Sequence, residues 1–191
     1  MHVEEQVRAQ YEAFPYPPRR ITDDAPAQIL SPLENLPFIL HHSRGGHWPM
    51  SKPWRVLVAG GGTGDAIVEL GVQLKTAGIE AELTYLDLAE RALNIARARA
   101  ERHGVHATFH RASLLDTAAR GLGPFDYINC SGVLHHLPDP GAGLRALAAV
   151  LAPGGTMGIM LYGALGRIGV YQAQQMLQLL GLHIAPDATK L

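Results

Sequence analysis

Two kinds of hydrophobic pattern alternate along the chain from residue 54 onward. Five short segments are almost wholly apolar, as expected for strands that are buried on both faces of a sheet. Longer segments follow in which apolar residues recur every three or four positions, the period of a helix with one buried face. The predicted strands are 55–59, 82–87, 107–110, 125–130 and 156–161. The predicted helices are 65–76, 88–103, 141–151 and 170–180.

The order of these segments indicates the fold class. Strand and helix alternate at least four times, which implies parallel strands joined by right-handed crossovers and covered on both faces. The sequence therefore predicts a doubly wound, mostly parallel α/β sheet with five strands. Leu144 and Leu147 are expected to face the core, and Pro153, Gly154 and Gly155 to stop the helix before the fifth strand.

The first 54 residues have a different composition. They hold eight of the chain's 13 prolines, which exclude a long helix or an interior strand after the first dozen residues. A short helix is predicted over residues 3–13, because its larger side chains recur at helical spacing. We expect an irregular arm after this helix that wraps the main domain. The predicted organisation is an N-terminal helix and proline-rich arm, residues 1–54, and a main domain, residues 55–191.

Charge and cysteine content narrow the functional classes. With 16 basic and 17 acidic residues, the chain has no overall positive field that would hold a nucleic acid. The single cysteine, Cys130, excludes an intrachain disulfide and a cysteine-rich zinc site, and favours the cytoplasm. The acidic N-terminus is unlike a secretory signal, and no apolar run is long enough to cross a membrane. The ten histidines include no pair at helical zinc-motif spacing, so we expect no metal.

The strongest functional signal is a glycine-rich loop after the first predicted strand. Gly60, Gly61, Gly62 and Gly64 are interrupted only by Thr63. In an open parallel sheet, ligands bind beyond the carboxyl ends of the strands, where the strand order reverses. Glycines there can take positive φ, and their backbone N–H groups can touch a ligand beside the start of the next helix. A plain structural turn would need only one or two glycines, so the loop predicts a bound ligand.

Two aspartates indicate the kind of ligand. Asp65, at the start of the next helix, would repel a pyrophosphate but suits a ligand with an ammonium or sulfonium group. Asp87 follows the second strand, 23 residues after Gly64, where a carboxylate can accept hydrogen bonds from both hydroxyls of a ribose. Capping of the following helix is the alternative role for this aspartate. Read from Gly62, the dinucleotide pattern GxGxxG lacks its third glycine, which disfavours a nicotinamide cofactor.

Five motifs follow one another between about residues 53 and 162. They are VLVAGGGTGD, YLDL, FHRASLLD, FDYINCSGVLHHLPDP and LAPGG. In this order and spacing they resemble the motifs of class I S-adenosylmethionine-dependent methyltransferases. The QYExxPYP-type arm within VRAQYEAFPYPPRR, together with MLYGALGR, further resembles a bacterial subgroup in which this domain often follows tetratricopeptide repeats. The sequence itself contains no such repeat.

The resemblance implies a site for S-adenosylmethionine that includes the whole glycine loop and Asp65. Gly60, Gly62 and Gly64 would surround the methionyl part of the cofactor, and Asp87 would bind its ribose hydroxyls. The other implied contacts are Leu88 and Leu114 against the adenine, Ser113 near the adenine amine, and Asn129, Ser131 and Gly132 at the mouth shared with the substrate.

Two residues are candidates for catalysis. One histidine of the pair His135-His136 acts as a general base in some relatives, which makes His135 the first candidate; packing or lining a pocket is the alternative. Tyr11 could place its hydroxyl near the cofactor, or could pin the arm to the domain. Other polar residues are given structural roles, namely Arg19-Arg20 as a solvated pair or a contact to an acidic substrate, Cys130 as a core residue, and Arg91, Arg97, Arg99 and Arg102 as the solvent face of a helix.

Three features depart from the family pattern. Val58 stands where many members have an acidic residue, and Ala112-Ser113 replaces a Gly-Asp pair near the adenine amine. Five strands are predicted where the family has seven, the last ones forming an antiparallel hairpin. Either the domain is truncated at its C-terminal end, or the exposed sheet edge is covered in another way, for example in an oligomer.

The leading hypothesis is methyl transfer from S-adenosylmethionine to an unidentified small molecule or protein. The sulfonium makes the methyl group electrophilic, so the protein need only hold a nucleophile in line with it, exclude water and remove a proton. One alternative is a cofactor-binding but inactive regulatory or interaction module, in keeping with Val58 and Ser113. A less favoured alternative is an NAD-dependent oxidoreductase.

Overall fold

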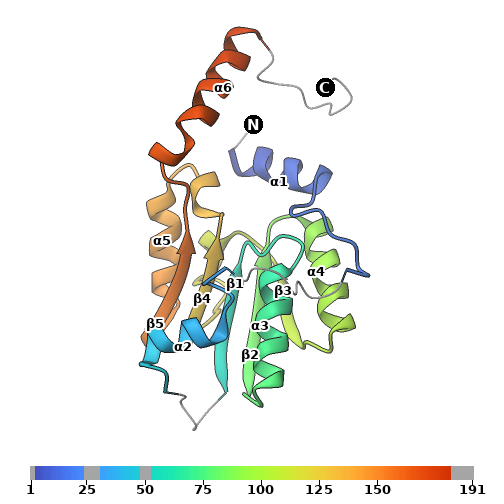
Figure 1. Cartoon of the computed structure of the whole chain (residues 1–191), viewed down its shortest axis with the longest axis vertical. Coiled ribbons are helices and arrows are strands. Elements are labelled where there is room, and N and C mark those ends of the chain that lie inside the picture. The colour runs from blue at the N-terminus through green and yellow to red at the C-terminus, as the bar shows by residue number, and fades with distance from the viewer. Residues whose placement is uncertain (1–2, 24–30, 48–52, 182–191) are drawn as a thin grey trace. The chain divides into compact units, whose positions relative to one another are not determined.

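A parallel five-stranded sheet lies at the centre of the fold (Figure 1). This computed structural model describes residues 3–23, 31–47 and 53–181. The strands lie in the order β3-β2-β1-β4-β5, and every neighbouring pair is parallel. The predicted fold class, an α/β sheet with five parallel strands, is therefore confirmed. The strands are β1 (Trp54–Ala59), β2 (Ala81–Asp87), β3 (Ala107–Arg111), β4 (Phe125–Ser131) and β5 (Leu151–Met160).

Helices cover both faces of the sheet because successive strand residues point to opposite sides. In β1, Val56 and Val58 enter one hydrophobic core, whereas Leu57 and Ala59 enter the other. The first core includes buried residues of α2, α3 and α4, and the second includes Leu147 of α5. These helices are α2 (Leu36–Arg44), α3 (Asp65–Thr76), α4 (Glu90–Arg102) and α5 (Pro140–Ala149).

Helix α2 lies where the sequence analysis expected only an irregular arm. Asn35 begins the helix, because its side-chain oxygen accepts a hydrogen bond of 2.9 Å from the Phe38 N–H. Pro37 is compatible with the first turn, where a missing N–H removes no hydrogen bond. Gly45, with φ of 59°, ends the helix. Pro37 therefore lies in the first turn of a short helix and does not mark an irregular segment.

The fifth strand begins earlier than predicted. Pro153, Gly154 and Gly155 lie inside β5, and α5 already ends at Ala149, so the expected role of this tripeptide as a helix stop is wrong. The pairing of β4 with β5 shifts register between Phe125 and Tyr127, where the extra residues of β5 are accommodated. Proline is tolerated there because β5 is an edge strand.

The interior face of α5 also differs from the prediction. Leu147 is fully buried, as expected, but Leu144 is 41% exposed. The prediction that both side chains face the core is wrong for Leu144.

The chain forms two units, Met1–Met160 and Leu161–Leu191. The first unit contains α1 (Val3–Ala13) together with the sheet, and the second contains η3 (Leu165–Arg167) and α6 (Ile168–Leu179). Neither η3 nor α6 has a buried residue. Within the described ranges, no helix combines the length and the apolar character that crossing a membrane requires.

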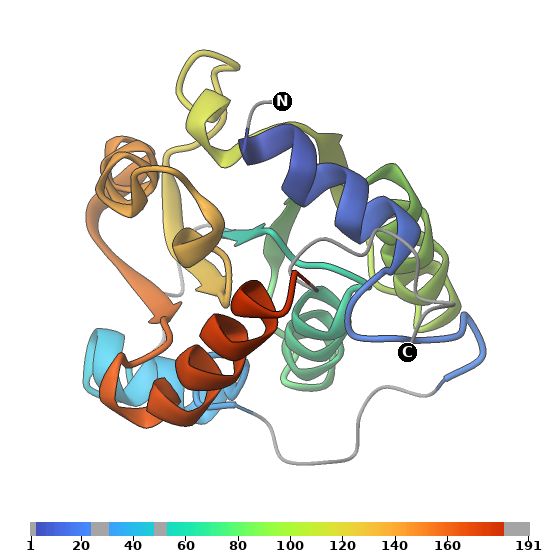
Figure 2. The ribbon, with the colours of Figure 1, turned by 90° about the horizontal axis from the view of Figure 1, so that it is seen from above.

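In the first unit, α1 lies beyond the carboxyl ends of the strands, on the side of α4 (Figures 1 and 2). Its position is fixed by Arg91 in the first turn of α4. The Arg91 N–H donates to the Glu12 carboxylate at 3.1 Å, and its guanidinium donates to the Ala13 carbonyl at 3.2 Å. The N-terminal helix is thus attached to the edge of the sheet at which ligands bind in this class of fold.

Replacement of Leu57 by alanine should lower the free energy of unfolding by about 2–5 kcal/mol, because this residue of β1 is fully buried in the core that also contains Leu147 of α5. Leu144→Ala is the matched control, since Leu144 is largely exposed, and should cost under about 1 kcal/mol. Chemical denaturation of both variants measures the difference. Equal losses would contradict the assignment of Leu57 to a core.

Candidate functional site

The glycine loop lies where the strand order reverses. β1 pairs with β2 on one side and with β4 on the other, so the loop after β1 occupies the position at which open α/β sheets bind ligands. Gly60, Gly62 and Gly64 have φ values of 71°, 57° and 97°. The predicted positive φ angles are therefore present, and residues with side chains rarely adopt them.

Each glycine of the loop faces a close neighbour from a different part of the chain. A Cβ atom at any of the four positions would approach that neighbour to less than 3.0 Å, so none could be accommodated without a shift. The neighbours are Val133 at Gly60, Tyr85 at Gly61, the Tyr16 carbonyl oxygen at Gly62 and Ala96 at Gly64. From the sequence, a bound cofactor was the expected reason for these glycines, whereas contacts within the chain already require all four.

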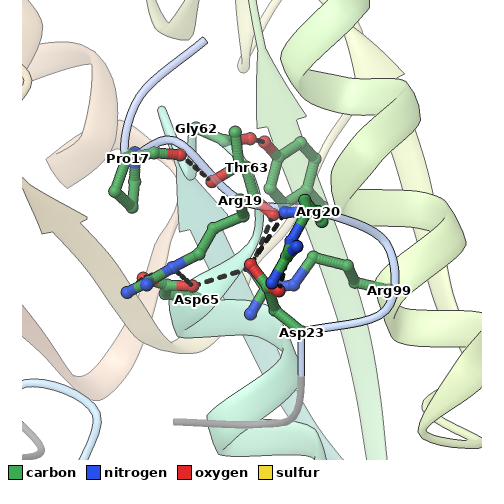
Figure 3. A network of polar contacts seen from close by, with 9 residues as sticks. Pro17, Arg19, Arg20, Asp23, Gly62, Thr63, Asp65 and Arg99 are labelled. Atoms are coloured by element: carbon green, nitrogen blue, oxygen red, sulfur yellow. Dashed lines mark hydrogen bonds and ion pairs between the residues drawn. The ribbon is translucent and has the colours of Figure 1, made fainter.

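The neighbour of Gly62 belongs to the arm segment, residues 14–23, which follows α1. The Thr63 N–H donates to the Tyr16 carbonyl at 3.2 Å. The Thr63 hydroxyl donates to the Pro17 carbonyl at 2.6 Å (Figure 3). Thr63 is completely buried. The arm segment is therefore bound directly to the glycine loop.

A network of three charged side chains joins the arm segment, the loop and α4 (Figure 3). The Arg19 guanidinium donates to both carboxylate oxygens of Asp65, with a shortest distance of 2.8 Å. From α4, Arg99 donates through Nη1 to Asp65 at 2.7 Å and to the Thr63 carbonyl at 2.8 Å. Asp65 thus meets two cations of the protein itself, in place of the cationic ligand expected from the sequence.

Arg99 corrects a second expectation. The sequence predicted that Arg99 lies on the solvent face of its helix, but its side chain has an exposed fraction of 0%. The signal was present, because Arg99 lies three residues after Ala96, which the apolar pattern places on the buried side. Arg19 also differs from expectation, since it pairs with Asp65, whereas its neighbour Arg20 pairs with Asp23.

The net charge environment keeps Asp65 ionised. Burial alone would raise the pKa of its carboxyl group, but hydrogen bonds from Arg19 and Arg99 outweigh burial and lower the pKa below its usual value. A lowered pKa in the folded protein stabilises it at neutral pH, and this contribution is lost as the pH falls through that pKa.

Asp87 anchors the other side of the loop. Its Oδ2 accepts a hydrogen bond from the Gly62 N–H, and its Oδ1 accepts one from the Ala89 N–H, both at 2.9 Å. Burial raises the pKa of this carboxyl group, although the backbone hydrogen bonds act in the opposite direction. A carboxylate has about four lone-pair positions, so both oxygens can accept a further donor. Helix α4 has Ala89 as its N-cap and no side-chain cap hydrogen bond, so the capping role considered from the sequence is wrong; Asp87 binds the N–H of the residue before the helix.

Asn129, near the end of β4, interacts with the chain segment that precedes α2. Its side-chain NH2 group donates to the Leu33 carbonyl at 3.0 Å and to the Glu34 carboxylate at 2.8 Å. Asn129 is 1% exposed and lies in register with Val58 of β1. The Glu34 carboxylate is thus bound to Asn129, which pairs with Val58, the position at which the resemblance predicts an acidic residue.

The next residues of β4 and its loop have different environments. Burial raises the pKa of the Cys130 thiol to about 12, in keeping with the predicted core role. Ser131 and Gly132, predicted at the mouth of the site, are half-buried at the carboxyl end of β4, and Gly132 has a positive φ of 74°.

Tyr11 of α1 contacts the histidine pair, which lies after β4. The Tyr11 hydroxyl lies 3.0 Å from His136 Nε2, and the rings of His135 and His136 have centroids 4.4 Å apart. Burial lowers the pKa of His136, which favours a neutral imidazole at neutral pH. The histidine in contact with Tyr11 is thus His136, whereas the sequence analysis gave His135 the first place. Both histidines belong to η2 (Leu134–His136).

The residues implied in adenine binding lie after β2 and β3. Leu88 is half-buried directly after Asp87, whereas Leu114 is 5% exposed and belongs to the core on the α5 side. The Ser113 hydroxyl accepts a hydrogen bond from the Leu115 N–H at 3.2 Å, which caps η1 (Leu114–Asp116). In the part of the chain that the structure describes, no three histidine, cysteine or acidic side chains gather to form a metal site.

Comparison with known proteins identifies the family to which the chain belongs. A family model described as a methyltransferase domain matches residues 57–157, just over half of the 191 residues. The chain belongs to this methyltransferase domain family. The match begins in β1 and ends in β5, so it includes the glycine loop, Asp87 and the histidine pair.

Two curated relatives of this methyltransferase domain share substantial identity with it. An uncharacterised protein of a Synechococcus strain is 38% identical over 183 residues, which cover 93% of this chain and 42% of that protein. A protein of Bordetella pertussis named ubiquinone biosynthesis O-methyltransferase is 32% identical over 114 residues, which cover 56% of this chain and 46% of that protein. The chain spans less than half the length of either relative.

A solved structure agrees in fold. The structure described for the conversion of a disulfide bond into a thioacetal group during echinomycin biosynthesis has a TM-score of 0.57 and 26% sequence identity. The similarity covers 90% of this chain and 67% of that one. The likeness therefore extends beyond the 57–157 segment.

Asp65→Ala should destabilise this methyltransferase domain by about 3 kcal/mol, because it leaves the buried Arg99 guanidinium without its acid. Arg19→Ala keeps the Arg99 pair intact and removes a half-exposed partner, so it should cost at most about 1 kcal/mol. Denaturant titration at neutral pH compares the two variants. A larger loss in Arg19→Ala than in Asp65→Ala would contradict the central role of the buried pair.

Proposed function

We propose that this chain binds S-adenosylmethionine and transfers its methyl group to an acceptor molecule. The observation that carries the proposal is the placement of Asp87. A half-buried carboxylate with a raised pKa, which accepts hydrogen bonds from the backbone N–H groups of Gly62 and Ala89, lies beside the glycine loop at the strand end where this fold binds ligands. Within a methyltransferase domain, such a carboxylate suits the ribose hydroxyls of the methyl donor.

The surrounding residues fit this donor. Asp87 would accept the ribose hydroxyls with its remaining lone pairs, while the half-buried Leu88 offers apolar surface for an adenine. Leu114 stays a proposed adenine contact, although its side chain is buried in the core in this structure. We keep the rest of the glycine loop, Ser113, Asn129, Ser131 and Gly132 as proposed contacts. When bound, the donor supplies an electrophilic methyl group on a sulfonium. The protein's own task is to hold the acceptor in line, exclude water and remove a proton where the chemistry requires it.

We propose that a histidine of η2, His136 or His135, accepts the proton. His136 is neutral at neutral pH because burial lowers its pKa, and the Tyr11 hydroxyl at 3.0 Å can orient the imidazole. His135, with its ring beside that of His136, stays the second candidate. A neutral imidazole suits an acceptor hydroxyl, and the O-methyltransferase name of the Bordetella relative favours oxygen as the methylated atom.

We further propose that the QYExxPYP-type arm is a shared feature of the bacterial subgroup that the sequence resembles. Similarity to the Synechococcus protein covers 93% of the chain and thus extends far outside residues 57–157. The arm segment contacts the glycine loop directly, so we assign it to the cofactor site. The family assignment disfavours the oxidoreductase alternative, and it gives no reason to prefer an inactive interaction module.

Titration calorimetry should show binding of S-adenosylmethionine and of S-adenosylhomocysteine, and no binding of NAD. The two sulfur ligands carry the ribose that Asp87 would hold and fit a methyltransferase domain, whereas the loop read from Gly62 lacks the third glycine of the dinucleotide pattern. Absence of heat with both sulfur ligands, in protein that is shown to be folded by circular dichroism, would refute the proposal.

Asp87→Ala should weaken S-adenosylmethionine binding by about 1.5–3 kcal/mol, the loss of hydrogen bonds to a charged acceptor. Because burial raises the pKa of Asp87, wild-type affinity should begin to fall at a pH above the range near 3.9 in which an exposed aspartate protonates. Asp116→Ala, which removes an exposed carboxylate of η1, is the matched control. Unchanged affinity in Asp87→Ala would remove this residue from the site.

A further inference from the structure

Two separate contacts hold the arm segment on the glycine loop. The first is made by Thr63, whose N–H and hydroxyl both donate to arm carbonyls. The second is made by Arg19, whose guanidinium grips Asp65 with a two-nitrogen, two-oxygen geometry. Bidentate pairs of this kind fix direction as well as distance. The arm segment is thus held by backbone and side-chain contacts to Thr63 in the loop and to Asp65 at the start of α3.

Asp65, the acid that pairs with Arg19, also pairs with Arg99 of α4. Arg99 is fully buried, and a buried guanidinium loses its hydration. Its Nη1 contacts both Asp65 and the Thr63 carbonyl, yet Nε and Nη2 make no hydrogen bond to any residue in the described structure. A burial that is only partly compensated contributes little to folding, so the value of Arg99 lies in where it places Asp65 and Thr63.

The same loop is tied to Asp87. The Gly62 N–H donates to the Asp87 carboxylate, and Gly62 is the residue next to Thr63. A displacement of the arm segment from Thr63 would therefore act on the residue adjacent to the Asp87 contact. Helix α4 holds both ends of this arrangement, because Arg91 fixes the end of α1 and Arg99 fixes the loop.

We propose that Arg19, Asp65 and Arg99 form an ionic latch that holds the arm segment closed over the glycine loop and thereby slows the release of bound S-adenosylmethionine. In this latch Arg19 is a positioning residue, since it acts on the site through Asp65. The part of the inference that concerns release rests on the proposed function. The part that concerns the position of the arm stands on the contacts alone.

The position of the arm can be measured by hydrogen exchange on the full chain without cofactor. The Thr63 amide donates to the arm, whereas the neighbouring Gly62 amide donates to Asp87, so the pair gives a reporter and its internal reference. In Arg19→Gln we expect the Thr63 amide to exchange about fivefold faster than in the wild type, and the Gly62 amide to change less than about twofold.

Arg20→Gln is the matched control, because Arg20 is the adjacent arginine, pairs with Asp23 inside the arm and has a side chain that is 86% exposed. It should leave the Thr63 amide unchanged. Arg19→Lys keeps the charge but loses the forked geometry, so its exchange rate should lie between those of wild type and Arg19→Gln. Equal Thr63 exchange in wild type and Arg19→Gln, or an equal increase in Arg20→Gln, would overturn the latch.

Stopped-flow dissociation of S-adenosylmethionine tests the consequence for the cofactor. Arg19→Gln should release it about fivefold faster, with the Arg20→Gln rate unchanged. If wild-type protein binds the cofactor and both variants release it at the wild-type rate, the effect on release is refuted. If the wild type binds no S-adenosylmethionine, the proposed function fails, while exchange at Thr63 still decides whether the latch exists.

Discussion

The tight space around the glycine loop is the constraint on which the site depends. Val133 comes from the loop after β4, Tyr85 from β2, Ala96 from α4, and the Tyr16 carbonyl from the arm segment, and each one fills the place where a loop side chain would otherwise lie. Since glycine alone leaves that space open, four separated parts of the chain can meet at one turn. The glycine loop is thus packed against the sheet, against helix α4 and against the arm segment at the same time.

The electrostatics follow from the same crowding. Asp65 is brought between Arg19 and Arg99 and stays ionised because their hydrogen bonds outweigh its burial. Asp87, at the same edge of the sheet, accepts hydrogen bonds from the backbone N–H groups of Gly62 and Ala89, and its pKa is raised by burial. Two aspartates with similar places in the sequence pattern therefore differ in role: one is satisfied by the protein's own cations, and the other retains the capacity to accept a ligand's hydroxyl groups.

The sequence predicted the features that depend on local period. The bounds of α3 and α1 agree with the expected segments, because apolar residues every three or four positions mark the buried side of a helix. All five strands were found, because short and almost wholly apolar segments are typical of strands buried on both faces. The partners of the site residues were missed because they lie far apart in the sequence. Arg99 is 34 residues from Asp65, Arg19 is 46 residues from it, and Asn129 is 96 residues from Leu33. No local pattern encodes such pairs, although the place of Arg99 beside Ala96 did indicate burial.

The burial of the single cysteine, Cys130, determines how the protein can be labelled. Cys130 lies inside β4 with no exposed surface, and a thiol whose pKa is near 12 forms almost no thiolate at neutral pH. The thiolate is the form that attacks thiol-reactive dyes and spin labels, so we expect almost no labelling of the native chain. One cysteine introduced at an exposed place on the arm, such as Tyr16, would become the sole labelled position, and the movement of that segment could be followed without first removing any native residue.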